Sequence, residues 1–292
     1  MNIVFLDRAT FSPEIVFRTE ALGDCAWRDY PMTGPEQVLE RSAAAAVIVT
    51  NKVKIPGAIL EAVPGLQLIA ATATGVDHID TEAARRRGVA VCSVPGYAVT
   101  TVPEHVFALA LALRRNLLRY DEAVRAGRWS RAAIFCLHAA PIVDLAGGTL
   151  GIVGAGALGR AVARLGKAFG MRVLLAERRA TAVRTGRTAF ETVLAESDVL
   201  SLHLPLTDET RHLIGVAELA LMKPDAILIN TARGALIDPV ALCQALAGGR
   251  LAGAGIDVLE QEPPPADHPL LAAGLPNFIL TPHVAWASDG AM

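Results

Sequence analysis

Short apolar runs alternate with amphipathic segments along almost the whole chain. Apolar runs bounded by turn residues are typical of buried strands, and the segments between them have the period of a helix. Because strands that alternate with helices usually pair in parallel, the pattern predicts an α/β fold. The expected strands are "NIVFL", "AAVIVT", "LQLIAAT" and "VAVCSV" in the first part, and "TLGIVG", "MRVLLAE", "DVLSLHLP", "AILINTA", "AGIDV" and "FILTP" in the second.

Helices are expected between these strands, several of them with a capping residue at the start. A longer amphipathic segment, 101–126, is expected to form one helix that stops at Gly127. The less regular segment 128–148 is expected to be a connecting segment. The other expected helices are 55–63, 81–87 with Asp80 as N-cap, 159–169, and a segment from Asp238 (N-cap) and Pro239 toward Gly248.

Composition narrows the class of protein. The 292 residues suffice for two domains, and a net charge of -2 gives no global attraction to nucleic acid or to a membrane surface. The four cysteines form no C-x-x-C pair and the seven histidines show no ligand spacing, so we expect reduced thiols and no metal. No apolar run is long enough to span a bilayer or to act as a signal peptide. These features predict a soluble cytoplasmic protein.

A glycine-rich turn follows the strand "TLGIVG". Gly154, Gly156 and Gly159 form the pattern G-x-G-x-x-G between an apolar strand and a helix. The first permits a tight turn, the second lets the backbone approach a pyrophosphate, and the third lets helix and strand pack closely. The helix start, with Ala157 and Leu158, would offer free N–H groups to the anion. The turn therefore predicts a dinucleotide site.

Glu177 ends the next strand, eighteen residues after Gly159. A carboxylate at this place would accept hydrogen bonds from the adenosine ribose hydroxyls and repel a 2′-phosphate, which favours NAD. Arg178 and Arg179 follow immediately, and an arginine there could bind that phosphate, so NADP stays possible.

Three later strand ends carry residues suited to hydride transfer to a 2-keto acid. Arg233 could hold the substrate carboxylate and polarise the carbonyl oxygen. His283 could donate a proton to the oxygen, and Glu262 could orient the imidazole and favour its protonated form. In an open α/β sheet all three would face the crevice that holds the glycine turn.

Five motifs, which include the glycine turn and the residues just named, resemble those of a known protein family: "GIVGAGALG", "SLHLPLTDETRHLI", "MKPDAILINTARGALID", "GIDVLEQEP" and "TPHVAWAS". In this order they resemble the D-isomer-specific 2-hydroxyacid dehydrogenases, and the match extends upstream through "ATGVDHID" and "SVPGYAVTTVPEH". The resemblance implies a Rossmann-type nicotinamide-binding domain, 97–285, inserted into a smaller flavodoxin-like parallel α/β substrate domain, 1–96 with 286–292 as the start of its return segment. It also implies a homodimer.

The resemblance also implies roles for individual residues. Arg233, Glu262 and His283 would be catalytic, and Asp257 would hold the nicotinamide carboxamide. Cofactor contacts would further come from Gly154, Gly156, Ala157, Leu158, Gly159, Glu177, Arg178, His203, Pro205, Thr210, Thr231 and Ala232, and substrate contacts from Thr74, Gly75, Val76 and Tyr97 together with Arg233 and His283.

Within the family, the chain looks most like glycerate dehydrogenases, also called hydroxypyruvate or glyoxylate reductases. Two alternatives stay open. The family includes a corepressor-like branch, so the chain could be a nicotinamide-sensing regulatory protein. Family members also continue past "HVAWAS" with a further helix, whereas this chain ends at Met292. It could therefore be an inactive, C-terminally truncated fragment.

Overall fold

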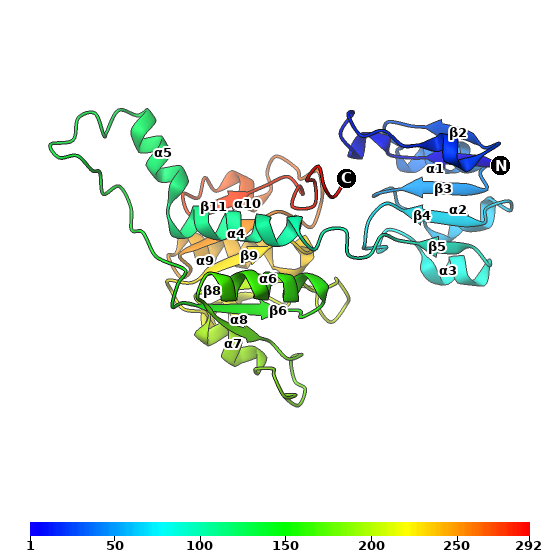
Figure 1. The fold of residues 1–292 in the computed structure, drawn as a ribbon. Coiled ribbons are helices and arrows are strands. Elements are labelled where there is room, and N and C mark those ends of the chain that lie inside the picture. The colour runs from blue at the N-terminus through cyan, green and yellow to red at the C-terminus, as the bar shows by residue number, and fades with distance from the viewer. The chain divides into compact units, whose positions relative to one another are not determined.

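The chain divides into two compact units. The computed structural model describes all residues from 1 to 292. One unit comprises Met1–Tyr97 with Met292, and the other comprises Ala98–Ala291 (Figure 1). This division lies one residue after the expected boundary, and residues 286–291 group with the second unit. No helix is both long and apolar enough to pass through a bilayer.

The first unit is a five-stranded parallel sheet with short helices. Its strand order, β2-β1-β3-β4-β5, is that of flavodoxin-like folds, as expected. Four strands agree with the predicted runs, but β2 was not predicted because it is a mostly exposed edge strand without an apolar run. The elements are β1 (Asn2–Phe5), β2 (Ala26–Asp29), α1 (Val38–Ser42), β3 (Val47–Thr50), α2 (Gly57–Ala62), β4 (Leu68–Ala71), α3 (Thr81–Arg86) and β5 (Ala90–Cys92), with 3₁₀ turns at Arg8–Thr10, Thr19–Leu22 and Pro35–Gln37.

The second unit is a six-stranded parallel sheet in the order β11-β10-β9-β8-β6-β7. The chain leaves β6 for β7 on one side and returns to β8 on the other, so the order reverses at β6 as in Rossmann-type folds. The expected fold class is confirmed. The elements are β6 (Thr149–Val153), α6 (Ala157–Ala168), β7 (Arg172–Leu175), α7 (Phe190–Glu196), β8 (Val199–Leu202), α8 (Val216–Leu221), β9 (Ile227–Asn230), a 3₁₀ turn (Gly234–Leu236), α9 (Pro239–Ala247), β10 (Gly253–Ile256), α10 (Pro269–Ala272) and β11 (Phe278–Leu280).

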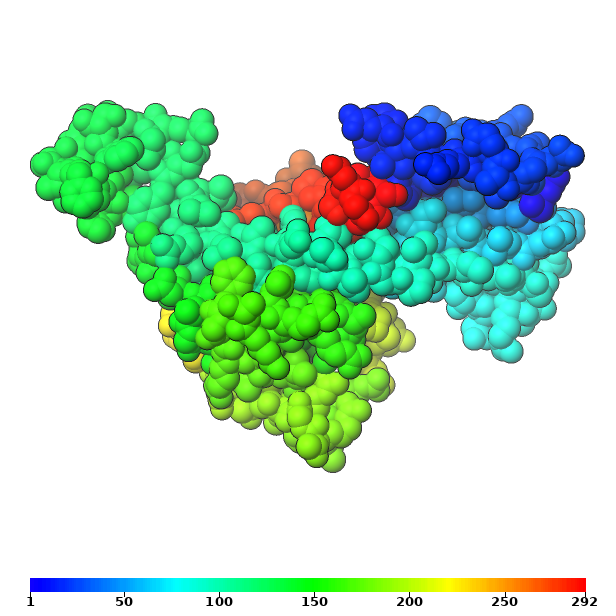
Figure 2. Space-filling model, viewed as in Figure 1, coloured from blue at the N-terminus to red at the C-terminus, as the bar shows by residue number.

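The single long helix expected over 101–126 is wrong. The structure has two helices, α4 (Thr101–Arg114) and α5 (Leu117–Arg125), and Asn116 between them has a φ of 51°. Asparagine tolerates this left-handed backbone, and its side chain donates to the carbonyl oxygen of Pro141 (2.6 Å). The apolar pattern continues through the break, so the period alone could not reveal it. In Figures 1 and 2, α5 and the segment after it project from the rest of this unit.

The predicted N-caps are confirmed at two helices. Asp80 accepts a hydrogen bond from the backbone N–H of Ala83, and Asp238 accepts from those of Val240 and Ala241. Each cap satisfies N–H groups that have no partner inside the helix. The helix starts are therefore fixed by residues visible in the sequence.

A buried aspartate ties together two strand ends of the first unit. Asp7 follows β1, is only 1% exposed, and accepts hydrogen bonds from the backbone N–H groups of Asn51 (2.9 Å), Lys52 (2.6 Å) and Val53 (3.3 Å). These groups belong to the loop that follows β3. The carboxylate therefore fixes that loop at the carboxyl edge of the sheet.

We predict that Asp7→Ala lowers the free energy of unfolding of the first unit by about 2 kcal/mol or more, because buried N–H groups lose their acceptor. The measurement is urea denaturation of the variant beside the parent chain. Asp24→Ala, at an exposed carboxylate, is the matched control and should leave stability unchanged. Equal stability of Asp7→Ala and the parent would contradict this role.

Candidate active site and cofactor cavity

The loop that carries His283 is held by a buried carboxylate. Asp257 follows β10 and is 1% exposed. One carboxylate oxygen accepts from the backbone N–H of Val284 (3.0 Å) and from the hydroxyl of Thr281, and the other accepts from the N–H of Ala285 (2.9 Å). His283 itself has a φ of 55°, which is uncommon for a residue with a side chain. The hydrogen bonds to Asp257 hold the backbone in this conformation and so set the direction of the ring.

His283 is paired with Glu262. The ring nitrogen Nδ1 lies 2.6 Å from Oε2 of Glu262, and Oε1 accepts from the N–H of Leu259 (2.8 Å). The His283 side chain is 25% exposed and that of Glu262 is 35% exposed, and both line a cavity of about 310 Å³. With Nδ1 bound to the carboxylate, Nε2 is the nitrogen available to a substrate. The structure thus brings together two of the three residues predicted to be catalytic.

Arg233 lies in the loop after β9. The neighbouring strand in the sheet is β10, and the loop after β10 carries Glu262. Asn230, which is fully buried at the end of β9, shapes this loop. Its amide donates to the carbonyl oxygen of Arg233 (2.9 Å) and accepts from the N–H of Ala232 (3.0 Å). Sequence reasoning missed Asn230, although a polar residue that ends the buried run "ILIN" was a usable signal.

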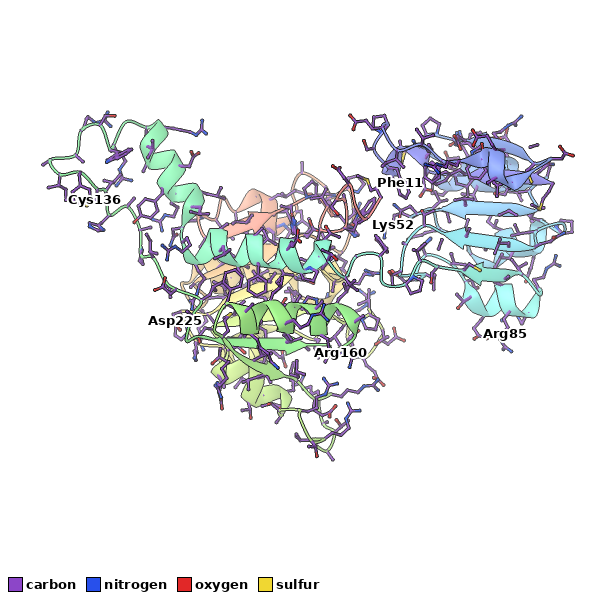
Figure 3. All side chains as sticks on the ribbon, in the orientation of Figure 1. Phe11, Lys52, Arg85, Cys136, Arg160 and Asp225 are labelled. Carbon is purple, nitrogen blue, oxygen red and sulfur yellow. The ribbon has the colours of Figure 1, made fainter.

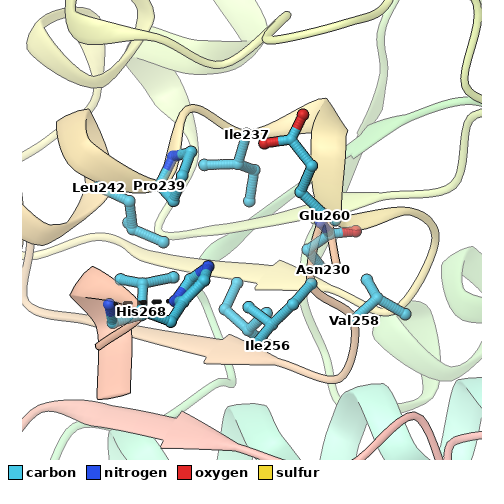
Figure 4. Close-up of a pocket in the computed structure, with 11 residues that line it drawn as sticks. Asn230, Ile237, Pro239, Leu242, Ile256, Val258, Glu260 and His268 are labelled. Carbon is cyan, nitrogen blue, oxygen red and sulfur yellow. Dashed lines mark hydrogen bonds between the residues drawn. The ribbon is translucent and has the colours of Figure 1, made fainter. Parts of the chain in front are cut away.

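The loops that carry Arg233 and Glu262 pack directly on each other. A Cβ added at Gly234 would lie 2.0 Å from the carbonyl carbon of Leu259, so only glycine allows this approach. Figure 4 shows Asn230, Val258 and Glu260 around a small void where the two loops meet. Gly234 therefore keeps Arg233 in register with the His283–Glu262 pair.

The glycine turn has the geometry expected of a phosphate-binding loop. Gly154 has a φ of 100°, and a Cβ there would lie 2.4 Å from the carbonyl oxygen of His203. A Cβ at Gly159 would lie 2.0 Å from the carbonyl oxygen of Gly154, whereas the space in front of Gly156 is open. Gly156 caps α6, whose first N–H groups have no partner inside the helix.

A cavity of about 930 Å³ opens in front of this turn. Of the predicted cofactor residues, seven line it: Gly154, Gly156, Glu177, Arg178, His203, Pro205 and Thr210. Six do not line it: Ala157, Leu158 and Gly159 lie in the first turn of α6, Thr231 and Ala232 follow β9, and Asp257 holds the His283 loop. The hydroxyl of Thr231 is buried and has no hydrogen-bond partner, which fits a polar group of a bound molecule. These residues fit a nicotinamide dinucleotide.

His203 lines the cavity as an uncharged ring. Burial lowers the pKa of His203 from 6.5 to about 4, and Nε2 lies 2.9 Å from the hydroxyl of Ser201. The residue is therefore neutral at physiological pH and offers hydrogen bonds without a charge. In the unfolded chain the His203 imidazole takes up a proton at a higher pH than in the folded chain. The free energy of unfolding therefore decreases as the pH falls from 6.5 toward about 4.

Arginines gather at the end of the cavity beyond β7. Glu177 is buried there, and Arg184 holds both of its carboxylate oxygens, at 2.6 and 2.7 Å. The hydrogen bonds from Arg184, with those of the Arg178 and Arg184 N–H groups, lower the pKa of Glu177 to about 2. Sequence reasoning stopped at Arg179, but the cavity is also lined by Arg184, Arg187 and Arg211.

The predicted substrate residues lie in two different units. Thr74, Gly75 and Val76 follow β4 in the first unit, and the hydroxyl of Thr74 donates to the carbonyl oxygen of Val94 (2.8 Å). Tyr97 is the last residue of that unit before α4. Their grouping with Arg233 and His283 stays a prediction. No group of three or more His, Cys, Asp or Glu side chains could hold a metal ion.

Residues 107–285 match the family model "D-isomer specific 2-hydroxyacid dehydrogenase, NAD binding domain". The chain is 45% identical to a glycerate dehydrogenase from Methylorubrum extorquens, over all of this chain and 91% of that protein. It is 40% identical to a glyoxylate reductase from Aeropyrum pernix, over 98% of this chain and 87% of that protein.

Among solved structures, an acyclic imino acid reductase in complex with NADPH and D-Arg superposes with a TM-score of 0.85. That likeness covers all of this chain and 92% of the other, at 28% identity. The matched family model spans most of the unit that holds the glycine turn and the His283–Glu262 pair. The chain therefore belongs to the D-isomer specific 2-hydroxyacid dehydrogenases.

Proposed function

We propose that the protein reduces small 2-keto acids, such as hydroxypyruvate and glyoxylate, to D-glycerate and glycolate with NADH or NADPH. The observation that carries this proposal is the His283–Glu262 pair, at 2.6 Å, in the same unit as a glycine turn with the geometry of a phosphate-binding loop. The names of the glycerate dehydrogenase and the glyoxylate reductase among its relatives support this choice of substrates.

The chemistry follows from the residues at the strand ends. A reduced nicotinamide dinucleotide would be held in the cavity in front of Gly154 and Gly156, and would supply the hydride that the carbonyl carbon accepts. Nε2 of His283 donates a proton to the carbonyl oxygen, while Glu262 holds Nδ1 and so orients the ring. Arg233 binds the substrate carboxylate and polarises the carbonyl through its guanidinium group.

We propose substrate contacts in the first unit as well. The backbone N–H groups at Thr74, Gly75 and Val76 bind the carboxylate, and Tyr97 lies nearby. Backbone N–H groups in a turn suit a carboxylate because they carry partial positive charge without a mobile side chain.

We also propose that the active protein is a homodimer. The arm formed by α5 and residues 126–148 projects from the second unit, and Figure 3 labels Cys136 within it. It exposes large apolar side chains, with Phe135 at 90% and Ile134 at 61% exposure. Apolar side chains on a projecting arm favour burial against another surface, and a second copy supplies that surface by two-fold symmetry.

We predict that His283→Ala lowers kcat for hydroxypyruvate reduction by roughly 10²–10⁴-fold, the usual contribution of a general acid. Affinity for NADH should stay unchanged, because His283 does not line the dinucleotide cavity. The measurement is steady-state oxidation of NADH and NADPH with hydroxypyruvate, glyoxylate and pyruvate, beside a titration of NADH binding. Near-parental turnover of the variant would remove His283 from the mechanism. If the parental chain binds NADH without turnover, the result would instead support a nicotinamide-sensing protein.

We predict that Phe135→Glu converts the dimer to a monomer, because a charge in an apolar interface is costly to bury. Sedimentation velocity of the two proteins measures the change. Val16→Glu, at an apolar side chain that is 79% exposed in the first unit, is the control and should leave the dimer intact. A parental chain that sediments as a monomer would overturn the proposal.

A further inference from the structure

We propose that Arg178 and Arg184 form a binding site for the 2′-phosphate of NADPH, and that Glu177 positions Arg184 instead of selecting NADH. This inference rests on the proposed function, because it requires the cavity in front of the glycine turn to bind a nicotinamide dinucleotide. It assigns a role to an arginine that the sequence motifs did not single out, seven residues after the acid at the end of β7.

The carboxylate of Glu177 already has its hydrogen bonds. Oε1 accepts from the N–H of Arg178 (2.9 Å) and from Nη2 of Arg184 (2.7 Å), and Oε2 accepts from Nε of Arg184 (2.6 Å). The side chain is only 3% exposed. A ribose hydroxyl would have to displace a charged, two-pronged partner to reach these oxygens, which a neutral donor does poorly. Glu177 is therefore not available to select NADH.

Arg184 is presented to the cavity by this pairing. Its guanidinium uses Nε and Nη2 to bind Glu177, so Nη1 faces away from the carboxylate. The side chain is 68% exposed and lines the cavity. A planar guanidinium held at two points has lost its freedom before a ligand arrives, so it binds an anion at a smaller entropic cost. The negative charge of Glu177 is meanwhile offset within the pair.

Arg178 provides the second cation. Its backbone N–H binds Glu177, and its exposed side chain lines the same cavity without a carboxylate partner. Two other lining arginines are already engaged: Arg179 lies 2.9 Å from Glu218, and Arg211 lies 2.8 Å from Glu260. In dinucleotide-binding folds the acid after the second strand, here Glu177 after β7, lies at the adenosine ribose. Arg178 and Arg184 thus flank that position. A phosphate dianion there would receive charge-assisted hydrogen bonds from both.

The test isolates the 2′-phosphate from the rest of the cofactor. Adenosine 2′,5′-bisphosphate and 5′-AMP differ in that group alone, and isothermal titration gives the dissociation constant of each without any turnover. The parental chain should bind the bisphosphate at least about tenfold more tightly, a factor that corresponds to about 1.4 kcal/mol. NADPH and NADH should differ in the same direction.

Arg184→Ala should reverse this preference. The variant removes one phosphate ligand and also exposes the carboxylate of Glu177 to the ribose, where it repels the 2′-phosphate and accepts from the hydroxyls. We expect the bisphosphate to lose more than about tenfold in affinity while 5′-AMP keeps or gains affinity. Arg178→Ala should also weaken the bisphosphate, with Glu177 still paired.

Arg187→Ala is the matched control. It removes the same charge from the same cavity but leaves the Glu177–Arg184 pair intact, so the affinity for the bisphosphate should fall clearly less than in Arg184→Ala.

Equal losses of bisphosphate affinity in Arg184→Ala and Arg187→Ala would overturn the site in favour of a general positive field. A parental chain that binds both nucleotides equally would overturn it too. If neither nucleotide binds, the dinucleotide cavity itself is refuted and the proposed function falls with it. Melting curves of each variant establish that it is folded.

Discussion

The buried carboxylate of Asp257 is the contact on which the active site depends. A charge at 1% exposure is tolerated only when hydrogen bonds satisfy it, and here the donors all come from the short segment 281–285. That segment contains His283, which has a left-handed backbone conformation that glycine adopts more easily than a residue with a side chain. Satisfying the carboxylate therefore fixes the conformation of the loop that carries His283. His105 of α4 extends the network through Thr281 (3.0 Å), so the first helix of the unit also supports this loop.

The same device occurs in both units of the chain. In each parallel sheet an aspartate lies one or two residues after the end of a strand and accepts from N–H groups of the loop after another strand: Asp7 from residues 51–53, and Asp257 from residues 284 and 285. Loops at the carboxyl edge of a parallel sheet have no ladder to hold them, so a buried acceptor supplies that order. Resemblance to the family assigned Asp257 to the nicotinamide carboxamide. Both of its carboxylate oxygens accept hydrogen bonds from the loop, so in this structure Asp257 positions the segment that carries His283.

The parts of the fold that follow from local patterns were predictable from the sequence. The buried strands form apolar runs, and the caps at Asp80 and Asp238 act on adjacent N–H groups. The edge strand β2 and the break at Asn116 were not predictable, because one has no apolar run and the other depends on a contact with Pro141. The pair His283–Glu262 was expected and is formed. The role of Glu177 could not be inferred from its position after β7, because it depends on how the following loop returns Arg184 to it.

In the proposed reaction, a 2-keto acid bound beside the His283–Glu262 pair receives a hydride on one face and a proton from Nε2. The most direct test is the chirality of the product. Purified protein is given hydroxypyruvate with NADH or NADPH, and the glycerate formed is resolved by chiral chromatography. We expect D-glycerate alone, as in a D-isomer specific family. L-glycerate, a racemic product, or bound cofactor that is never oxidised would contradict it.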